Sequence, residues 1–283
     1  MLRKESDTEN SVSFVNAEDG CSIAVRSLRT GSTALPPVLA IHALAMDGTM
    51  WSDAVSFLSS DISVLAIDCR GHGQSDKPLG PYSTELFARD LGHVLDQSGH
   101  TRAIIAGCSM GGTTALAFAG RYPDRVAGLC LFDTTAWYGE DAPAKWEQRA
   151  QKALSEGMAA LIEFQLGRWF SPEFLSARPD VAQRALGIFL ANDTQAYAES
   201  CRMLGQADER ERLHRYRGPA YLSAGENDFA TPLAMAEEIA KRMPQAKLSL
   251  IPHARHFTPF EAPREIAARI EQTIHEVRNR FQE

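Results

Sequence analysis

The chain has 283 residues, of which 44% are hydrophobic and 23% charged, as is typical of a globular protein with one sizeable core or a core plus an inserted subdomain. Its 29 Lys and Arg against 36 Asp and Glu give a net charge of -7 without a basic cluster, so nucleic acid is not an expected partner. No stretch approaches the length of a membrane span, so a membrane is not an expected partner either. Residues 1–10 are polar and charged rather than a signal peptide, which predicts a flexible N-terminus and a cytoplasmic protein.

Eight short apolar or β-branched runs predict strands. In chain order these are 11–15, 22–25, 38–42, 64–67, 103–106, 129–132, 220–223 and 248–251. Helical patterns lie between several of them, at 84–97, 110–121, 233–242 and 264–281. Most later strands are continuously apolar, which favours a mostly parallel, doubly wound α/β sheet of about eight strands with helices on both faces.

Between residues 135 and 217 the strand pattern disappears and the sequence becomes helical and rich in alanine and tryptophan. The alternation of strands and helices resumes at Pro219. This interruption predicts a helical cap at 135–217 inserted into one α/β core formed by residues 11–134 and 218–283.

Residues 104–112 join an apolar run to a helical pattern through the G-x-S-x-G sequence centred on Ser109. This order is typical of a nucleophile elbow, a sharp turn from strand to helix that exposes a serine hydroxyl. The backbone N–H of Met110 begins the helix, where the helix dipole favours an anion beside the serine. We therefore expect Ser109 to act as a nucleophile.

A serine hydroxyl is a weak nucleophile and needs a base, which in turn needs an orienting acid. Asp228 follows the strand at 220–223 and is the preferred acid, with Glu226 as a neighbouring candidate and Asp133 as a rival after the strand at 129–132. His256 is the preferred base over His253, because it lies deeper in its loop ahead of an H-x-x-x-x-E-x-P pattern.

The loop after the strand at 38–42 is where the second oxyanion donor of such a site is expected, and we assign it to the N–H of Leu44. The Gly-rich residues 68–75 lack both a following G-K-[ST] and dinucleotide-binding spacing, so a structural turn braced by Asp68 and Arg70 is expected rather than a phosphate site.

The cysteines are odd in number and lack C-x-x-C spacing, so neither disulfides nor a metal site is expected and buried thiols are predicted. They are Cys21, Cys69, Cys108, Cys130 and Cys201.

The order of His42, the D-x-R-G-H-G-x-S motif, G-x-S-x-G-G, Asp228 and His256 resembles the α/β-hydrolase fold serine hydrolases, from about Val12 to the C-terminus. Residues 42–44, 50–51, 78–83 and 107–112 are similar to those of the 3-oxoadipate enol-lactonases. Those enzymes usually carry glycine where Ala45 stands here.

The resemblance implies an esterase or lactonase acting on a small ester or lactone, with no metal or organic cofactor. The cap would supply specificity, with tryptophans as apolar walls and arginines that bind a carboxylate. The candidate substrate-binding residues are His42, Trp137, Trp146, Arg149, Arg168 and Trp169. Other chemistry on the same triad stays open, namely carbon–carbon bond hydrolysis, lyase or cofactor-free haloperoxidase activity, as do a ligand receptor with little turnover and a homo-oligomeric state.

Overall fold

Eight strands form one sheet in the computed structural model, which describes residues 11–32 and 34–280. Their order is β1-β2-β4-β3-β5-β6-β7-β8. Strand β2 runs antiparallel to both of its neighbours, while every pairing from β4 to β8 is parallel. The strands are β1 (Ser11–Asn16), β2 (Ser22–Arg29), β3 (Val38–Ile41), β4 (Val64–Ile67), β5 (Ala103–Cys108), β6 (Val126–Phe132), β7 (Ala220–Gly225) and β8 (Ala246–Ile251). The predicted mostly parallel sheet is confirmed, and the predicted flexible segment 1–10 lies outside the described residues.

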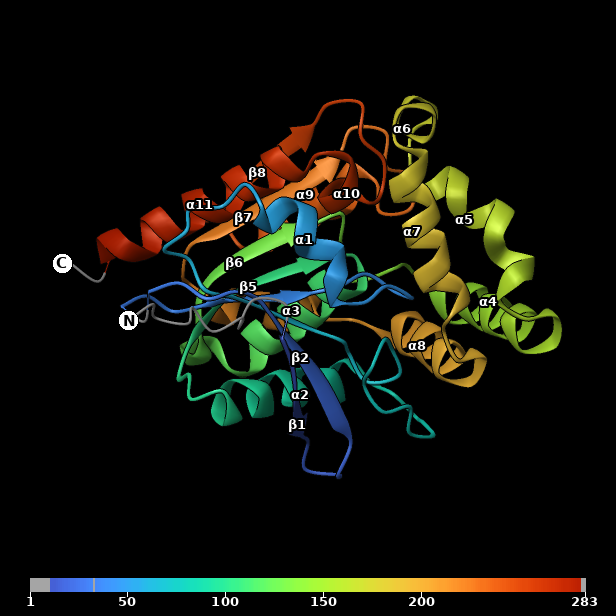
Figure 1. Ribbon diagram of the computed structural model, residues 1–283, viewed down its shortest axis with the longest axis horizontal. Coiled ribbons are helices and arrows are strands. Elements are labelled where there is room, and N and C mark those ends of the chain that lie inside the picture. The colour runs from blue at the N-terminus through green and yellow to red at the C-terminus, as the bar shows by residue number, and fades with distance from the viewer. Residues whose placement is uncertain (1–10, 33, 281–283) are drawn as a thin grey trace, which may run out of the picture.

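Helices cover both faces of this sheet (Figure 1). Helices α2 and α3 pack on each other on one face, and α1 packs with α11 on the other. The bounds are α1 (Ser52–Val55), α2 (Thr84–Gln97), α3 (Met110–Arg121), α9 (Leu233–Arg242), α10 (Thr258–Glu261) and α11 (Pro263–Arg280). Short 3-10 turns lie at η1 (Gly48–Trp51), η2 (Pro123–Arg125), η3 (Met158–Leu161) and η4 (Arg210–Arg215). Helix α11 begins one residue earlier than predicted, because Pro263 is accommodated in the first turn.

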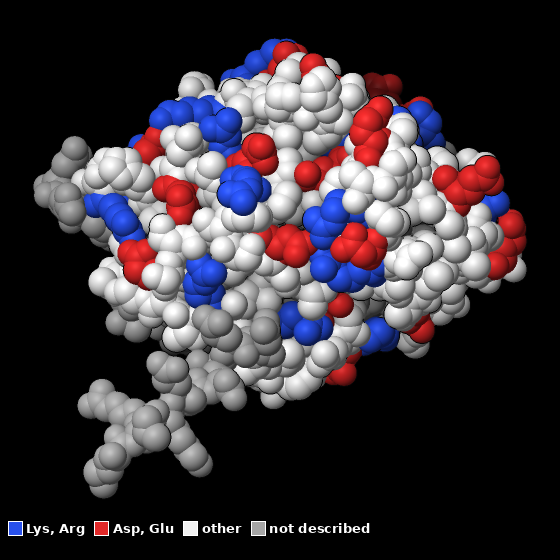
Figure 2. Space-filling model, turned by 45° about the horizontal axis from the view of Figure 1, so that its top comes forward, with Lys and Arg blue, Asp and Glu red and all other residues white. Residues whose placement is uncertain are grey.

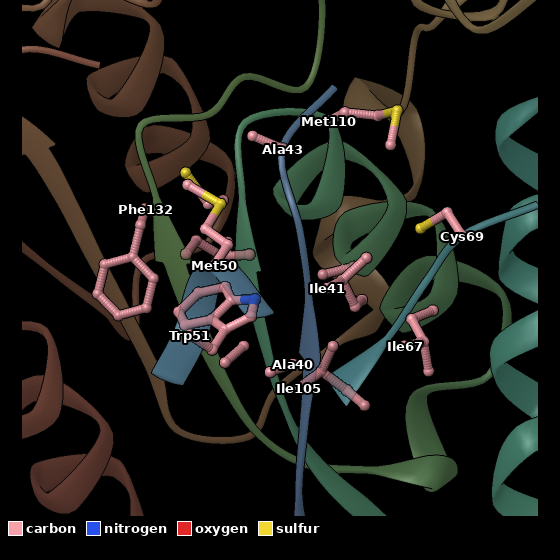
Figure 3. Packing of buried hydrophobic residues seen from close by; sticks show 14 of the residues in the cluster. Ala40, Ile41, Ala43, Met50, Trp51, Ile67, Cys69, Ile105, Met110 and Phe132 are labelled. Atoms are coloured by element: carbon pink, nitrogen blue, oxygen red, sulfur yellow. The ribbon is translucent and has the colours of Figure 1, made fainter. Parts of the chain in front are cut away.

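The core lies where the central strands meet these helices. Every residue of β3, β5 and β6 is buried, which explains why their sequences are continuously apolar rather than alternating. Figure 3 shows Trp51 beside Phe132, with 5.9 Å between their ring centroids, and Ile105 of β5 in the same cluster. This packing holds the carboxyl ends of β3, β5 and β6 in fixed relative positions.

Five helices join β6 to β7 and gather at one end of the sheet (Figure 1). They are α4 (Ala142–Glu156), α5 (Ile162–Trp169), α6 (Pro172–Ala177), α7 (Pro179–Leu190) and α8 (Thr194–Gln206). Helices α4 and α8 pack along each other. The predicted inserted helical cap is confirmed.

On the face drawn in Figure 2, acidic and basic side chains are interspersed among uncharged ones. Among residues 11–32 and 34–280, no helix combines the length and the apolar character that crossing a bilayer requires.

Candidate active site

Ser109 occupies the turn between β5 and α3 in a strained backbone conformation, with φ 52° and ψ -115°. Two glycines permit the turn. A Cβ on Gly107 would lie 2.4 Å from the carbonyl oxygen of Gly111, and one on Gly111 would lie 2.2 Å from that of Ile41. Both distances are far inside van der Waals contact, so the helix can approach the strands only because these residues lack side chains.

The Ser109 hydroxyl meets the ring of His256. Ser109 Oγ lies 2.9 Å from His256 Nε2, and His256 Nδ1 lies 2.8 Å from Asp228 Oδ2. An ionised carboxylate only accepts hydrogen bonds, so Nδ1 carries a proton and Nε2 is free to accept from the serine. The three side chains come from the carboxyl ends of β5, β7 and β8, which the parallel sheet brings to one edge.

Asp228 is held as an anion by a dense set of donors. Its Oδ1 accepts from the N–H groups of Ala230 and Thr231 at 2.7 and 3.0 Å, and its Oδ2 accepts from the Thr231 hydroxyl at 2.7 Å. Burial acts to raise the pKa of Asp228, but the interaction with His256 and these hydrogen bonds outweigh it and lower the pKa to about 2. The carboxylate is therefore charged throughout the neutral pH range.

Asp133, the rival acid, does not hydrogen-bond the His256 ring. Its Oδ1 accepts from the N–H of Gly225 at 3.0 Å, and its Oδ2 accepts from the N–H and hydroxyl of Thr258 at 3.0 and 2.6 Å. Burial, reinforced by the charge of Asp228, raises the pKa of Asp133 well above its usual range. Asp133 thus connects the loop before Asp228 to the loop after His256.

Glu226 and His253 interact with each other rather than with the nucleophile. The His253 side chain is 92% exposed, and Glu226 accepts a hydrogen bond from the His253 N–H at 2.9 Å. In the expected H-x-x-x-x-E-x-P tail, Glu261 accepts from the N–H of Arg255 at 2.6 Å and from that of Ser171 at 2.7 Å. Glu261 therefore ties the histidine loop to the cap.

Leu44 lies in the loop after β3 and shares a cavity with Ser109. Within the described residues, the N–H groups of Leu44 and Met110 make no hydrogen bond to protein. Ala45 has φ 61°, a left-handed conformation that glycine adopts more readily. Asn192 Nδ2 donates to the Ala45 carbonyl at 2.9 Å, so the cap holds this loop.

His42, a predicted substrate-binding residue, does not line the cavity that contains Ser109. Its ring is fully buried, with Nδ1 2.8 Å from the Ala43 carbonyl and Nε2 accepting from the Cys69 N–H at 2.9 Å. Both ring nitrogens are occupied by backbone groups, so His42 braces the loop after β3. The nearby 68–75 turn is structural as expected: Asp68 pairs with Arg26 at 2.7 Å, and Arg70 pairs with Asp90 at 2.6 Å.

A cavity of about 980 Å³ opens between Ser109 and the cap. Four of the predicted cap residues line it, together with several residues that the sequence analysis did not single out. The predicted ones are Trp146, Arg149, Arg168 and Trp169; the others include Tyr138, Phe164, Gln165 and Phe229. Phe229 could have been suspected from its place beside Asp228, whereas the cap residues have no motif to mark them.

Two cationic side chains face this cavity without a carboxylate partner. Arg149 donates to the Tyr197 hydroxyl at 2.6 Å and lies 4.9 Å above the Trp146 ring. Arg168 lies 4.9 Å from the Phe164 ring centroid. In the described part of the chain neither arginine forms an ion pair. Burial together with the charge of Arg149 lowers the pKa of Arg168, while the charge of Asp228 acts to raise it. The cavity is thus lined by aromatic and aliphatic side chains together with charged ones, which besides the two arginines include Lys145, Lys152 and Glu163.

Trp137 is not a wall of this cavity. Its backbone bridges to Asp208, and the Arg210 guanidinium stacks 3.7 Å from its ring centroid, where the cap begins and ends.

The five cysteines are confirmed as free and buried. Burial raises the pKa of Cys108, beside Ser109, well above its usual range, which disfavours the thiolate form of this side chain. Across the described ranges, His, Cys, Asp and Glu side chains form no group of three placed to hold a metal.

Several known proteins are similar to this chain. The chain is 30% identical over 229 residues to 3-oxoadipate enol-lactonase 1 of Acinetobacter baylyi, covering 81% of this chain and 84% of that protein. The crystal structure of an enol-lactonase from Burkholderia xenovorans LB400 superposes with a TM-score of 0.87 at 30% identity, covering 93% of this chain and 100% of that one. A malate-bound thermophilic esterase from Thermogutta terrifontis has a TM-score of 0.87 at 26% identity, covering 94% and 99% of the two chains. Residues 36–263 match the alpha/beta hydrolase fold family, and the chain belongs to it.

Proposed function

We propose that the protein is a serine hydrolase that cleaves a small carboxylic ester or lactone through an acyl-enzyme on Ser109. The observation that carries the proposal is the hydrogen-bonded chain from Ser109 Oγ to His256 Nε2 and from His256 Nδ1 to Asp228, at 2.9 and 2.8 Å. These hydrogen-bonded side chains supply the base and the orienting acid that a serine nucleophile requires.

The reaction follows from these contacts. His256 accepts the Ser109 proton as Oγ bonds to the acyl carbon, and the N–H groups of Leu44 and Met110 donate to the resulting oxyanion. The leaving oxygen takes the proton from His256 as its bond to carbon breaks. In a lactone this opens the ring, so the alcohol stays attached to the acyl group. Water then attacks the ester on Ser109, giving its proton to His256, and the acid is released as Ser109 recovers a proton.

An anionic acyl chain is the substrate feature that the cavity favours, with 3-oxoadipate enol-lactone as one candidate. Among the described residues Arg149 and Arg168 form no ion pair, although the charge of Asp228 acts on Arg168, and a substrate carboxylate would pair with them. The similar enol-lactonases and the malate-bound esterase support this choice.

The test compares kcat/KM for a carboxylate-bearing enol-lactone, its methyl ester and phenyl acetate. Ser109→Ala should lower turnover of all three by about five to six orders of magnitude, as removal of a triad serine does elsewhere, without lowering Tm. Near wild-type turnover by Ser109→Ala would contradict the serine mechanism.

Substrate choice is tested separately with Arg168→Met. It should lower kcat/KM for the carboxylate substrate about 10- to 100-fold more than for its methyl ester. Arg178→Met is the control, because Arg178 is exposed and pairs with Asp180 outside the cavity. If the wild type preferred the neutral compounds, the proposed carboxylate specificity would be wrong, and the protein would be a general esterase.

A further inference from the structure

The cap contacts the loop after β3 through Asn192, which lies between α7 and α8. Its Nδ2 donates to the Ala45 carbonyl at 2.9 Å and to the carbonyls of Ile188 and Phe189, at the end of α7, at 2.9 and 3.1 Å. Its Oδ1 is buried and has no hydrogen-bond partner among residues 11–32 and 34–280. Turning the amide over would place that oxygen against the three carbonyls, so the amide bridges the cap and the loop in this orientation only.

Residues 43–46 form a turn whose conformation is unfavourable for alanine. The Met46 N–H donates to the Ala43 carbonyl at 3.0 Å and closes the turn, and Ala45, its third residue, has φ 61°. Residues with a side chain avoid this left-handed region, which glycine adopts freely. Ala45 is also fully buried, and within the described ranges no donor other than Asn192 reaches its carbonyl. Loss of the amide would therefore leave a buried carbonyl unpaired and remove the contact that opposes relaxation of the turn.

The turn also fixes the direction of the Leu44 N–H. The peptide unit that carries this N–H has the Ala43 carbonyl at its other end, and the two groups of a trans peptide point in opposite directions. The Ala43 carbonyl accepts from the Met46 N–H at 3.0 Å and from Nδ1 of His42 at 2.8 Å. The Leu44 N–H therefore points away from both of these donors, on a residue that lines the cavity with Ser109.

We propose that Asn192 is a positioning residue: by holding Ala45 in the left-handed conformation, it keeps the Leu44 N–H aimed at the oxyanion of the acyl group under attack. The inference rests on the proposed function and gives the cap a part in the chemical step as well as in substrate choice. An oxyanion donor acts on the negative charge that develops in the transition state. A misdirected Leu44 N–H therefore lowers kcat more than it raises KM.

Two measurements test this role. Asn192→Ala should lower kcat for p-nitrophenyl acetate about tenfold with KM within about twofold of the wild type, a part of the roughly hundredfold loss expected when a donor is removed outright. Phenylboronic acid gives the second measurement: boron accepts an electron pair from Ser109 Oγ, the serine proton goes to His256, and the tetrahedral anion takes the place of the oxyanion. Its inhibition constant should rise by a similar factor.

Asn192→Asp provides a second variant in case Asn192→Ala fails to fold. It keeps the size of the side chain, but an ionised carboxylate cannot donate to the Ala45 carbonyl. It should therefore lower kcat at least as much as Asn192→Ala does.

Asp193→Ala is the matched control for loosening of the cap. Asp193 is the next residue and caps α8 by accepting from the Ala196 N–H at 2.9 Å, and in the described part of the chain none of its hydrogen bonds goes to the 43–46 turn. This variant should lower Tm and leave kcat and the boronate inhibition constant unchanged.

Ala45→Gly supplies a rescue. Glycine holds the left-handed conformation without help from the amide, so Asn192→Ala should cost several-fold less in kcat when residue 45 is glycine. Unchanged kcat in Asn192→Ala, or equal losses of kcat in Asn192→Ala and Asp193→Ala, would overturn the proposal. Failure of the serine mechanism would appear instead as retained activity in Ser109→Ala.

Discussion

Two buried carboxylates lie at the carboxyl ends of neighbouring strands, and their surroundings drive their pKa values in opposite directions. Asp228 meets the imidazole and is held at low pKa, whereas Asp133 meets backbone N–H groups and a hydroxyl and its pKa is raised. Chain position alone made both of them candidates for the acid. Hydrogen bonds distinguish them, and only Asp228 reaches His256.

Asp228→Asn should lower kcat by roughly four orders of magnitude, because an amide in place of the carboxylate favours the wrong imidazole tautomer. Asp133→Asn keeps an oxygen that can accept from Thr258 and should cost far less. The measurement is kcat for both variants on one ester, with Tm recorded for each. The opposite ranking would assign the acid to Asp133.

The order of serine, aspartate and histidine was readable from the sequence because each follows a recognisable strand. Tyr138 was not, because nothing local distinguishes a cavity tyrosine from a packed one. Trp137 and His42 show the same difficulty in reverse. Each has a side chain suited to binding, but neighbours remote in sequence, Arg210 and the Cys69 N–H, occupy it.

The bounds of the helices and strands agree closely with the predicted ranges where the local sequence signals are strong. Helix α2 begins after Ser83, whose hydroxyl accepts from the Leu86 N–H at 3.1 Å, and its predicted bounds agree with the structure. Strands β5 to β8 extend past their predicted ends by up to three residues, because sheet pairing includes small residues such as Gly107 and Gly128 that carry no strand signal. The five cap helices could not be placed from the sequence, since their arrangement depends on packing between them.

The elbow between β5 and α3 should be intolerant of a single methyl group. Gly111→Ala should lower the free energy of unfolding by about 2–3 kcal/mol and reduce kcat, because its Cβ would overlap the Ile41 carbonyl at 2.2 Å. Gly187→Ala is the matched control: this exposed position in α7 has no neighbour within 4 Å of an added Cβ. It should be neutral or stabilising by about 0.5–1 kcal/mol. Equal urea midpoints for the two variants would refute the close-approach argument.

For the molecule as a whole, a buried histidine pair should set the onset of acid destabilisation. The His42 and His72 rings lie 4.9 Å apart and are fully buried. Burial, with a contribution from His42, lowers the pKa of His72 from 6.5 to about 3. Between these two pKa values, His72 is protonated in the unfolded chain but neutral in the folded chain. The free energy of unfolding therefore falls as the pH drops below about 6.5.

His72→Asn should remove part of that dependence. The amide can replace His72 Nδ1 as donor to the Arg70 carbonyl, 3.1 Å away, but it does not titrate. Between pH 6.5 and 5 the wild type should lose about 1–2 kcal/mol more stability than the variant in urea unfolding. His275→Asn, at an exposed position on α11, should keep the wild-type dependence. An unchanged pH slope in His72→Asn would rule out this histidine as the cause.

The hydrogen bond between Ser109 and His256 spans 147 residues of chain, with the cap and three strands in between. In the proposed mechanism, a chain emerging from the ribosome therefore presents its serine long before its base, and Ser109 remains an ordinary alcohol until the loop after β8 is in place. Contacts so distant in sequence form late in folding. Ester hydrolysis should therefore begin only after the sheet has formed. In a refolding time course, hydrolytic activity should return later than the helical circular dichroism signal.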